Sequence, residues 1–374
     1  MNVVRLTATA VVVGAFVALI GAGAGDDIPP PSGDGGAPPA APGEGPPMLA
    51  FSAQPRDGGP AQVFIVRAGG GVTQLTHERR GVELRGWWPD GVHLVGRSTN
   101  GREDLLVGIN AISGETATLW RGTPRIGDVV PSPTDESVAF AAGDRLSAMA
   151  TPGAPVVSLT SRYEMSDSGQ VAVPSVTWAA DGHTLAFTMR AGSSTQMAVE
   201  ATGRRSFVLP TGVRPICRSG AVIRSCPIDT QPAWQPGSGR IVYVRLIRGR
   251  SFLRWLTVPG GDSGLYRLPS TVGPGVTAPA WSPDGRRLAF VSDSGLFAMD
   301  ADGSSLQRVA ATTPTTAPSW SPDSSRIAYA VRNFSGSDEN VTVRGLNGER
   351  PFRVSQSPLY RHVIGPILWQ PQPV

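Results

Sequence analysis

The histidines and aspartates of this chain are the residues best suited to acid–base or metal chemistry, and most of them stand in a repeated setting. Four aspartates each follow a tryptophan by three residues: Asp90, Asp181, Asp284 and Asp323. The histidines are His77, His93, His183 and His362. Residues that recur in register occupy the same place on successive structural units, so they are kept apart rather than gathered. The pattern therefore predicts turn residues, with neither a metal site nor a cofactor.

A second candidate is Gly261-Asp262-Ser263-Gly264, which resembles the nucleophile loop of chymotrypsin-like proteases. Asp-Ser-Gly also occurs at 167–169 and 293–295, and no His–Asp partner pattern accompanies it. Asp300 and Asp302 stand in a D-x-D-G turn that lacks the bidentate glutamate of a calcium loop. Both segments are therefore interpreted as turns.

Arginine is the most informative charged residue, because the chain contains no lysine and its formal net charge is +4. Between Arg204 and Arg254, ten arginines stand against one acidic residue, Asp229. Arginine forks match carboxylates and phosphates. We therefore predict a surface for a protein or an anionic polymer, formed by Arg214, Arg218, Arg224, Arg245, Arg248 and Arg250. The alternative is that these arginines are scattered along strand edges, where positive charge discourages edge pairing.

The two cysteines, Cys217 and Cys226, lie inside this basic stretch. Their spacing is not C-x-x-C and no histidine cluster lies nearby, which argues against a redox pair or a metal site. In an exported protein the favoured interpretation is a structural disulfide. It would pin a loop that carries three of the arginines.

An alternative function is that of a polysaccharide lyase or hydrolase, with its catalytic side chains gathered at the mouth of a central channel. The candidates at those positions are Arg125, Tyr163, Glu164, Tyr360, Arg361 and His362. This set is thin, and the sequence favours a chain with no catalytic residues.

The elements that must position these residues are short strands in an internal repeat. The clearest copy runs from Trp281-Ser282-Pro283-Asp284-Gly285 into an apolar strand. Further copies begin at Trp87, Trp178, Trp234, Trp320 and Trp369, with a degenerate one at Pro131. Proline, aspartate and glycine close the turn, and the tryptophan packs between units. A spacing of about 47 residues fits four strands and matches propeller blades.

The two ends of the chain complete each other in this repeat. Met48–Phe51 matches a second strand and Val63–Val66 a third, whereas Ile367–Trp369 is a first strand without successors. Pairing of the two ends would close an all-β propeller. We predict seven four-stranded blades over residues 48–374.

The N-terminal residues predict export and a tether. Arg5 precedes an apolar run from Ala8 to Ile20, and Ala22-Gly23-Ala24 fits a cleavage site, so residues 1–24 are a predicted signal peptide or an uncleaved anchor. Residues 25–47 are rich in Gly, Pro and Ala and predict a disordered tether. We expect a secreted, periplasmic or envelope-associated protein, for which nucleic acid is a poor partner.

The repeats resemble those of the TolB-like, WD-like propellers of bacterial envelope proteins. The resemblance rests on the copies at Trp281 and Trp320 and on Phe297-Ala298-Met299-Asp300-Ala301-Asp302-Gly303. It implies a propeller fold, but TolB also has an α/β domain before its propeller and six blades, so its role is not carried over. The favoured hypothesis is a monomeric, non-enzymatic binding or scaffold module; a sensor module is a further alternative.

Overall fold

The structure, a computed structural model, describes thirteen segments of the chain. They are residues 47–67, 71–99, 102–123, 126–142, 145–159, 172–191, 194–201, 207–208, 227–259, 261–333, 338–346, 352–354 and 359–371. The chain divides after Ala40, and every strand lies in the unit Ala41–Val374. The predicted signal peptide and tether lie outside the described residues, except for Pro47, which is the first residue of a strand.

Three four-stranded sheets account for the first part of the unit. One consists of β28 (Tyr360–Trp369), β1 (Pro47–Pro55), β2 (Gln62–Arg67) and β3 (Val72–Gln74). The next consists of β4 (Glu83–Trp87), β5 (His93–Thr99), β6 (Asp104–Asn110) and β7 (Thr116–Gly122). The third consists of β8 (Ile126–Pro131), β9 (Val138–Ala142), β10 (Arg145–Met149) and β11 (Val157–Ser158).

An eight-stranded sheet and two further four-stranded sheets follow. The large sheet contains β12 (Ala172–Trp178), β13 (Thr184–Ala191), β14 (Ser194–Ala201) and β15 (Phe207–Val208), then β16 (Ile228–Trp234), β17 (Arg240–Ile247), β18 (Arg250–Thr257) and β19 (Ser263–Leu265). A short 3-10 helix, η2 (Ser270–Val272), precedes β20 (Thr277–Trp281), β21 (Arg287–Ser292), β22 (Gly295–Asp300) and β23 (Gln307–Ala310). The last sheet consists of β24 (Ser319–Trp320), β25 (Arg326–Arg332), β26 (Glu339–Gly345) and β27 (Phe352–Val354).

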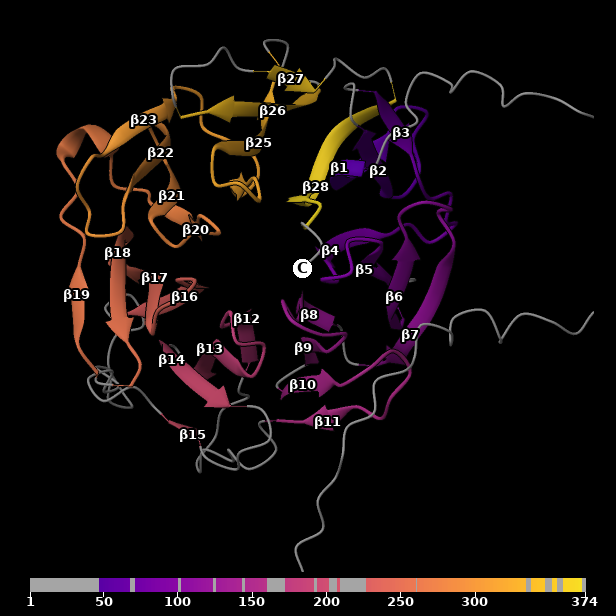
Figure 1. The fold of residues 1–374 in the computed structure, drawn as a ribbon, viewed down its shortest axis with the longest axis horizontal. Helices are drawn as coiled ribbons and strands as arrows, with labels where there is room; N and C mark the ends of the chain where they lie inside the picture. The colour runs from indigo at the N-terminus through magenta and orange to yellow at the C-terminus, as the bar shows by residue number, and fades with distance from the viewer. Residues whose placement is uncertain are drawn as a thin grey trace, which may run out of the picture. The chain divides into compact units, whose positions relative to one another are not determined.

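The sheets succeed one another around a central axis, with the first strand of each repeat innermost (Figure 1). This is the predicted propeller arrangement, but the prediction of seven separate blades is wrong in its count, because the described strands form six sheets. Two consecutive four-strand repeats are merged, since Thr195 of β14 and Ile228 of β16 form a parallel bridge. The last strand, β28, pairs antiparallel with β1, from Leu49 opposite Trp369 to Pro55 opposite Tyr360.

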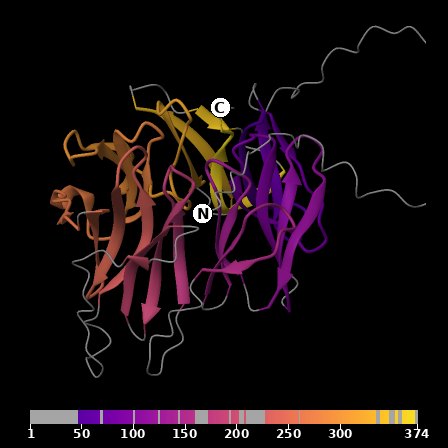
Figure 2. The same ribbon diagram turned by 60° about the horizontal axis from the view of Figure 1, so that its bottom comes forward.

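Strands buried on both faces explain why the repeat units need each other. On β17, Val242 and Val244 pack with Phe290 of the following sheet, whereas Ile241 and Tyr243 pack with the preceding repeat. Side chains alternate between the two faces of a strand, so each unit covers a face of both neighbours. The side view shows the strands of successive sheets standing side by side (Figure 2).

Tryptophan links the inner strands of neighbouring units, as the repeat predicted. The indole Nε1 of Trp281 donates to the carbonyl of Ala233, 3.2 Å away in the preceding unit. The equivalent donors, with their acceptors, are Trp87 to Leu368, Trp178 to Val130, Trp320 to Ala280 and Trp369 to Ser319. Trp234 departs from this pattern and donates within its own turn to Ser238, beside the merged repeats.

The antiparallel topology gives the ring two distinct faces. Every inner strand begins at the face formed by the hairpins between second and third strands and by the connections between units; we call it the loop face. The inner strands end at the opposite face, in the tryptophan turns or, for β8, in the turn that follows Pro131. The hairpins between third and fourth strands lie at the same face; we call it the turn face. In the described residues no helix has the length and apolar character needed to cross a membrane.

Candidate functional site

The repeated aspartates act as turn residues on the turn face. The Asp181 carboxylate accepts the backbone N–H groups of His183 and Thr184, and that of Asp284 accepts the N–H of Arg286 and the hydroxyl of Ser282. Partial burial on its own raises the pKa of both carboxyls, but these hydrogen bonds outweigh it and hold the pKa below the usual range. Both oxygens of Asp181 and Oδ1 of Asp284 are therefore already used by their own turns.

His93 forms an ion pair with the aspartate of its turn. Its Nδ1 lies 2.6 Å from Asp90 Oδ2. The hydrogen bond to Asp90 raises the pKa of His93, although partial burial opposes it. Within the described residues no three His, Cys, Asp or Glu side chains group closely enough to hold a metal ion.

Polar side chains of the inner strands hold neighbouring units together. Asp128 Oδ2 accepts the backbone N–H of Val176, 3.1 Å away on the next unit. Ser175 accepts the N–H of Gln231, whose side chain in turn accepts the N–H of Ala278. Three residues that could line a catalytic channel are thus engaged in joining four successive inner strands.

The first residue of the third strand makes a similar link at the loop face. Asp104 of β6 accepts the N–H of Ile126 at 2.7 Å, and Glu339 of β26 accepts that of Val363 at 2.8 Å. Both carboxylates are buried and both reach the start of the next inner strand. Sequence analysis missed them, although aligning the repeats on their third strands would have shown polar residues in the same register.

A charged cluster lies where the unit β4–β7 meets β8. Arg85 donates to Glu83 at 2.6 Å, and the Nε of Arg97 lies 3.9 Å from both Glu83 and Asp104. Burial raises the pKa of the adjacent Asp128 carboxyl, while its hydrogen bond from Val176 and the charge of Arg85 lower it in part. The cluster contains both signs of charge and is partly open to solvent, because the Arg85 and Glu83 side chains are 20% and 32% exposed.

The predicted arginine surface is found only in part. Arg248 and Arg250 are exposed, on the tight hairpin between β17 and β18 at the loop face. Arg245 contradicts the prediction, because it is 7% exposed and its Nε and Nη2 donate to the two oxygens of buried Asp229 at 2.6 and 2.7 Å. It faces the preceding repeat rather than solvent. Arg214, Arg218, Arg224 and both cysteines, Cys217 and Cys226, lie outside the described residues.

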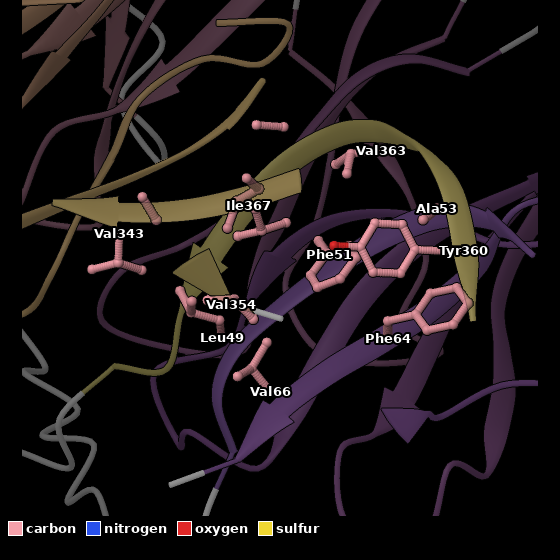
Figure 3. Packing of buried hydrophobic residues seen from close by; sticks show 13 residues of the cluster. Leu49, Phe51, Ala53, Phe64, Val66, Val343, Val354, Tyr360, Val363 and Ile367 are labelled. Carbon is pink, nitrogen blue, oxygen red and sulfur yellow. The ribbon is translucent and has the colours of Figure 1, made fainter. Parts of the chain in front are cut away.

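The predicted set at the channel mouth does not assemble in the described part of the chain. Tyr360 is buried between Phe51 and Phe64, with ring centroids 5.1 and 5.6 Å away, because β28 and β1 fold it into the core (Figure 3). Burial raises the pKa of Tyr360 to about 12. Arg361 and His362, which follow it, are exposed at the loop face. Arg125, Tyr163 and Glu164 lie outside the described residues.

Exposed charges are sharply divided between the two faces. Among the described residues, eleven exposed arginines belong to the hairpins, connections and strand ends of the loop face: Arg56, Arg79, Arg80, Arg102, Arg121, Arg145, Arg248, Arg250, Arg267, Arg332 and Arg361. Arg308, exposed on β23, donates to the carbonyls of Ser294 and Ala311. The exposed acids at the loop face are Asp57 and Asp293. At the turn face the exposed acids are Asp90, Glu115, Asp135, Glu136, Asp181, Asp262, Asp284, Asp302 and Asp323, against Arg286 and Arg326. The loop face is the candidate functional site.

The other acids of the loop face are buried or paired with arginines of the same face. Asp338 lies 2.7 Å from Arg56, and Glu103 lies 3.9 Å from Arg121. Asp104, Asp229 and Glu339 are buried. Arg56, Arg121 and Arg332 are thus compensated by acids of the same face, and the remaining excess of exposed arginine over exposed acid favours negatively charged partners.

Comparison with known proteins identifies a fold. No protein-family model matches the chain, and no curated relative does. Among solved structures, TolB from Acinetobacter baumannii is similar with a TM-score of 0.54 at 13% identity, over 87% of this chain and 67% of that one. The chain thus has a TolB-like β-propeller fold.

Two enzymes share the same fold. An oligogalacturonate lyase solved in complex with manganese gives a TM-score of 0.56 at 14% identity, over 80% of this chain and 91% of that one. A puromycin-hydrolyzing peptidase of Mycobacterium tuberculosis gives 0.56 at 16% identity, over 86% of this chain and 54% of that one. Identities this low show the fold alone, so the function has to be argued from the site.

Proposed function

We propose that the protein is an exported, non-enzymatic binding module whose loop face contacts a protein or an anionic polymer of the cell envelope. The observation that carries this proposal is the use of polar groups near the axis: Asp128, Ser175 and Gln231 join successive inner strands. In this arrangement the three side chains serve to join the inner strands, which is a structural role. Export rests on the N-terminal sequence pattern.

A propeller enzyme acting on an anionic polysaccharide is the second candidate function. Asp128 favours it, because burial raises the pKa of this carboxyl beside the arginines of the charged cluster. A carboxyl of raised pKa next to a cation suits general acid catalysis on a charged substrate. The lyase and the peptidase that share the fold act as enzymes, which makes a direct test necessary.

Incubation of the full chain with polyuronates and with peptides distinguishes the two functions. We expect retention of a ligand without release of product. Steady product formation above a protein-free control would overturn the proposal. Loss of that turnover in Asp128→Asn, but not in Asp181→Asn on the turn face, would then assign the catalysis to the charged cluster.

A further inference from the structure

The unpaired arginines of the loop face lie on two separate parts of the propeller rather than in a single pocket. In the part of the chain that the structure describes, six exposed arginines have guanidinium groups without a hydrogen bond or ion pair: Arg79, Arg80, Arg248, Arg250, Arg267 and Arg361. They belong to the connections before β4 and β20, to the β17–β18 hairpin and to the start of β28. A small anion could meet one of these groups at a time, whereas a long polyanion could meet several.

We infer that the loop face binds a linear polymer carrying phosphate or carboxylate groups at regular spacing. This inference rests on the proposed binding function and names its partner class. Guanidinium groups present planar, paired donors that fit both kinds of anion. Contact with several arginines at once raises the affinity of a long chain well above that of its monomer.

The turn face of a second copy has opposite charge but is a poor occupant. Asp90, Asp181 and Asp323 each receive hydrogen bonds on both carboxylate oxygens from their own turns. Arginine would have to compete with these bonds, which are made before any copies meet. These competing hydrogen bonds disfavour head-to-tail stacking of copies.

A lipid surface fits the loop face less well than a polymer does. Proteins that lie on membranes insert aromatic or large aliphatic side chains between the headgroups. The large hydrophobic side chains exposed in the described residues are Ile112, Val157, Ile228, Leu265 and Leu359, and none is aromatic. Ile228 and Leu359 stand at the loop face at 42% and 41% exposure, and they belong to different units.

The test compares matched charge removals on the two faces of the full chain. Arg248→Asn/Arg250→Ser and Arg79→Ser/Arg80→Ser each remove two charges from the loop face; asparagine is used at Arg248 because this residue has φ 51. Arg286→Ser/Arg326→Ser removes two from the turn face. The probes are long-chain polyphosphate, a polyuronate of similar length, inorganic phosphate and vesicles containing anionic lipid.

We expect each loop-face pair to weaken polymer binding about five- to tenfold and to reduce its salt dependence, while the control pair changes it less than about twofold. Affinity for polyphosphate should rise with chain length. The inference would be overturned by an equal loss of polymer binding in all three variants, or by inorganic phosphate binding as strongly as the polymer. It would also be overturned if the protein bound vesicles alone, or if sedimentation showed that self-association of the protein explains the apparent polymer binding. Polymer cleavage would instead overturn the proposed function, whichever face carries the contact.

Discussion

The loop face and the turn face of this ring are built from the same strands but use charge in opposite ways. At the turn face the aspartates that follow a tryptophan by three residues accept hydrogen bonds from their own turns, as Asp181 does from His183 and Thr184. At the loop face acids pair between neighbouring units, as Asp338 does with Arg56, and further exposed arginines have no acidic partner. The turn face therefore uses its repeated aspartates within the fold, whereas the loop face exposes more arginines than acids.

Removal of the last strand should have the largest effect on stability, because β28 runs between the two faces and pairs with β1. Deleting residues 363–374 removes the partners of Phe51 and Ala53 in β1 and the indole of Trp369. Two sheet edges would then be exposed to association. We expect loss of cooperative thermal unfolding, or aggregation, in calorimetry and light scattering.

Deletion of 370–374 is the matched control, because it leaves β28 complete. This deletion removes Gln370, whose side chain donates to the carbonyl of Gly91, and residues that follow the last strand. A truncation at 363 that melts like this control would show that the ring does not depend on the pairing of its ends.

At the turn face, Trp281→Ala should destabilise the fold by about 3–5 kcal/mol, as large-to-small changes of buried aromatic residues do. Trp281 is 8% exposed and bridges two units. Trp234→Ala should cost less, about 1–2 kcal/mol, because this residue is only partly buried and its indole bonds within its own turn. Urea unfolding measures both, and equal losses would contradict a bridging role for Trp281.

Near the loop face, Arg245→Met should destabilise the fold by about 3 kcal/mol, because the substitution leaves the Asp229 carboxylate buried without its partner. Arg245→Met/Asp229→Leu should recover most of that loss, since a buried pair can be replaced by apolar residues at little cost. If the double variant is as unstable as the single one, the two residues do not act as a pair. Arg248→Asn/Arg250→Ser should leave stability nearly unchanged, as exposed charges contribute little.

The smallest expected effect concerns the His93–Asp90 pair. The folded-state pKa of His93 is raised, so its contribution is fully present below the unfolded pKa of about 6.5 and is lost as the pH rises through the folded value. His93→Gln should therefore reduce the melting temperature more at about pH 5.5 than at about pH 8.5. With Asp90→Asn as background, this dependence on pH should disappear; its persistence would assign it to other groups.

Much of the ring could be predicted from the sequence because its information is local and repeated. The Trp–Asp–Gly turn dictates where an inner strand ends, and continuous apolar runs such as Leu288–Val291 indicate strands buried on both faces. Hence the strands around Trp281 and Trp320, the turn role of Asp284 and the pairing of the last strand with the first were all expected.

Only the tertiary structure decided which charges are free. Arg245 and Arg248 stand three residues apart in one basic stretch, yet one lies under the preceding repeat against Asp229 and the other lies on an exposed hairpin. Tyr360, which was expected at a channel mouth, is packed against Phe51 and Phe64 from the other end of the chain. Burial and pairing depend on residues distant in sequence, so composition reveals an excess of arginine, whereas the order of strands around the ring decides where it meets solvent.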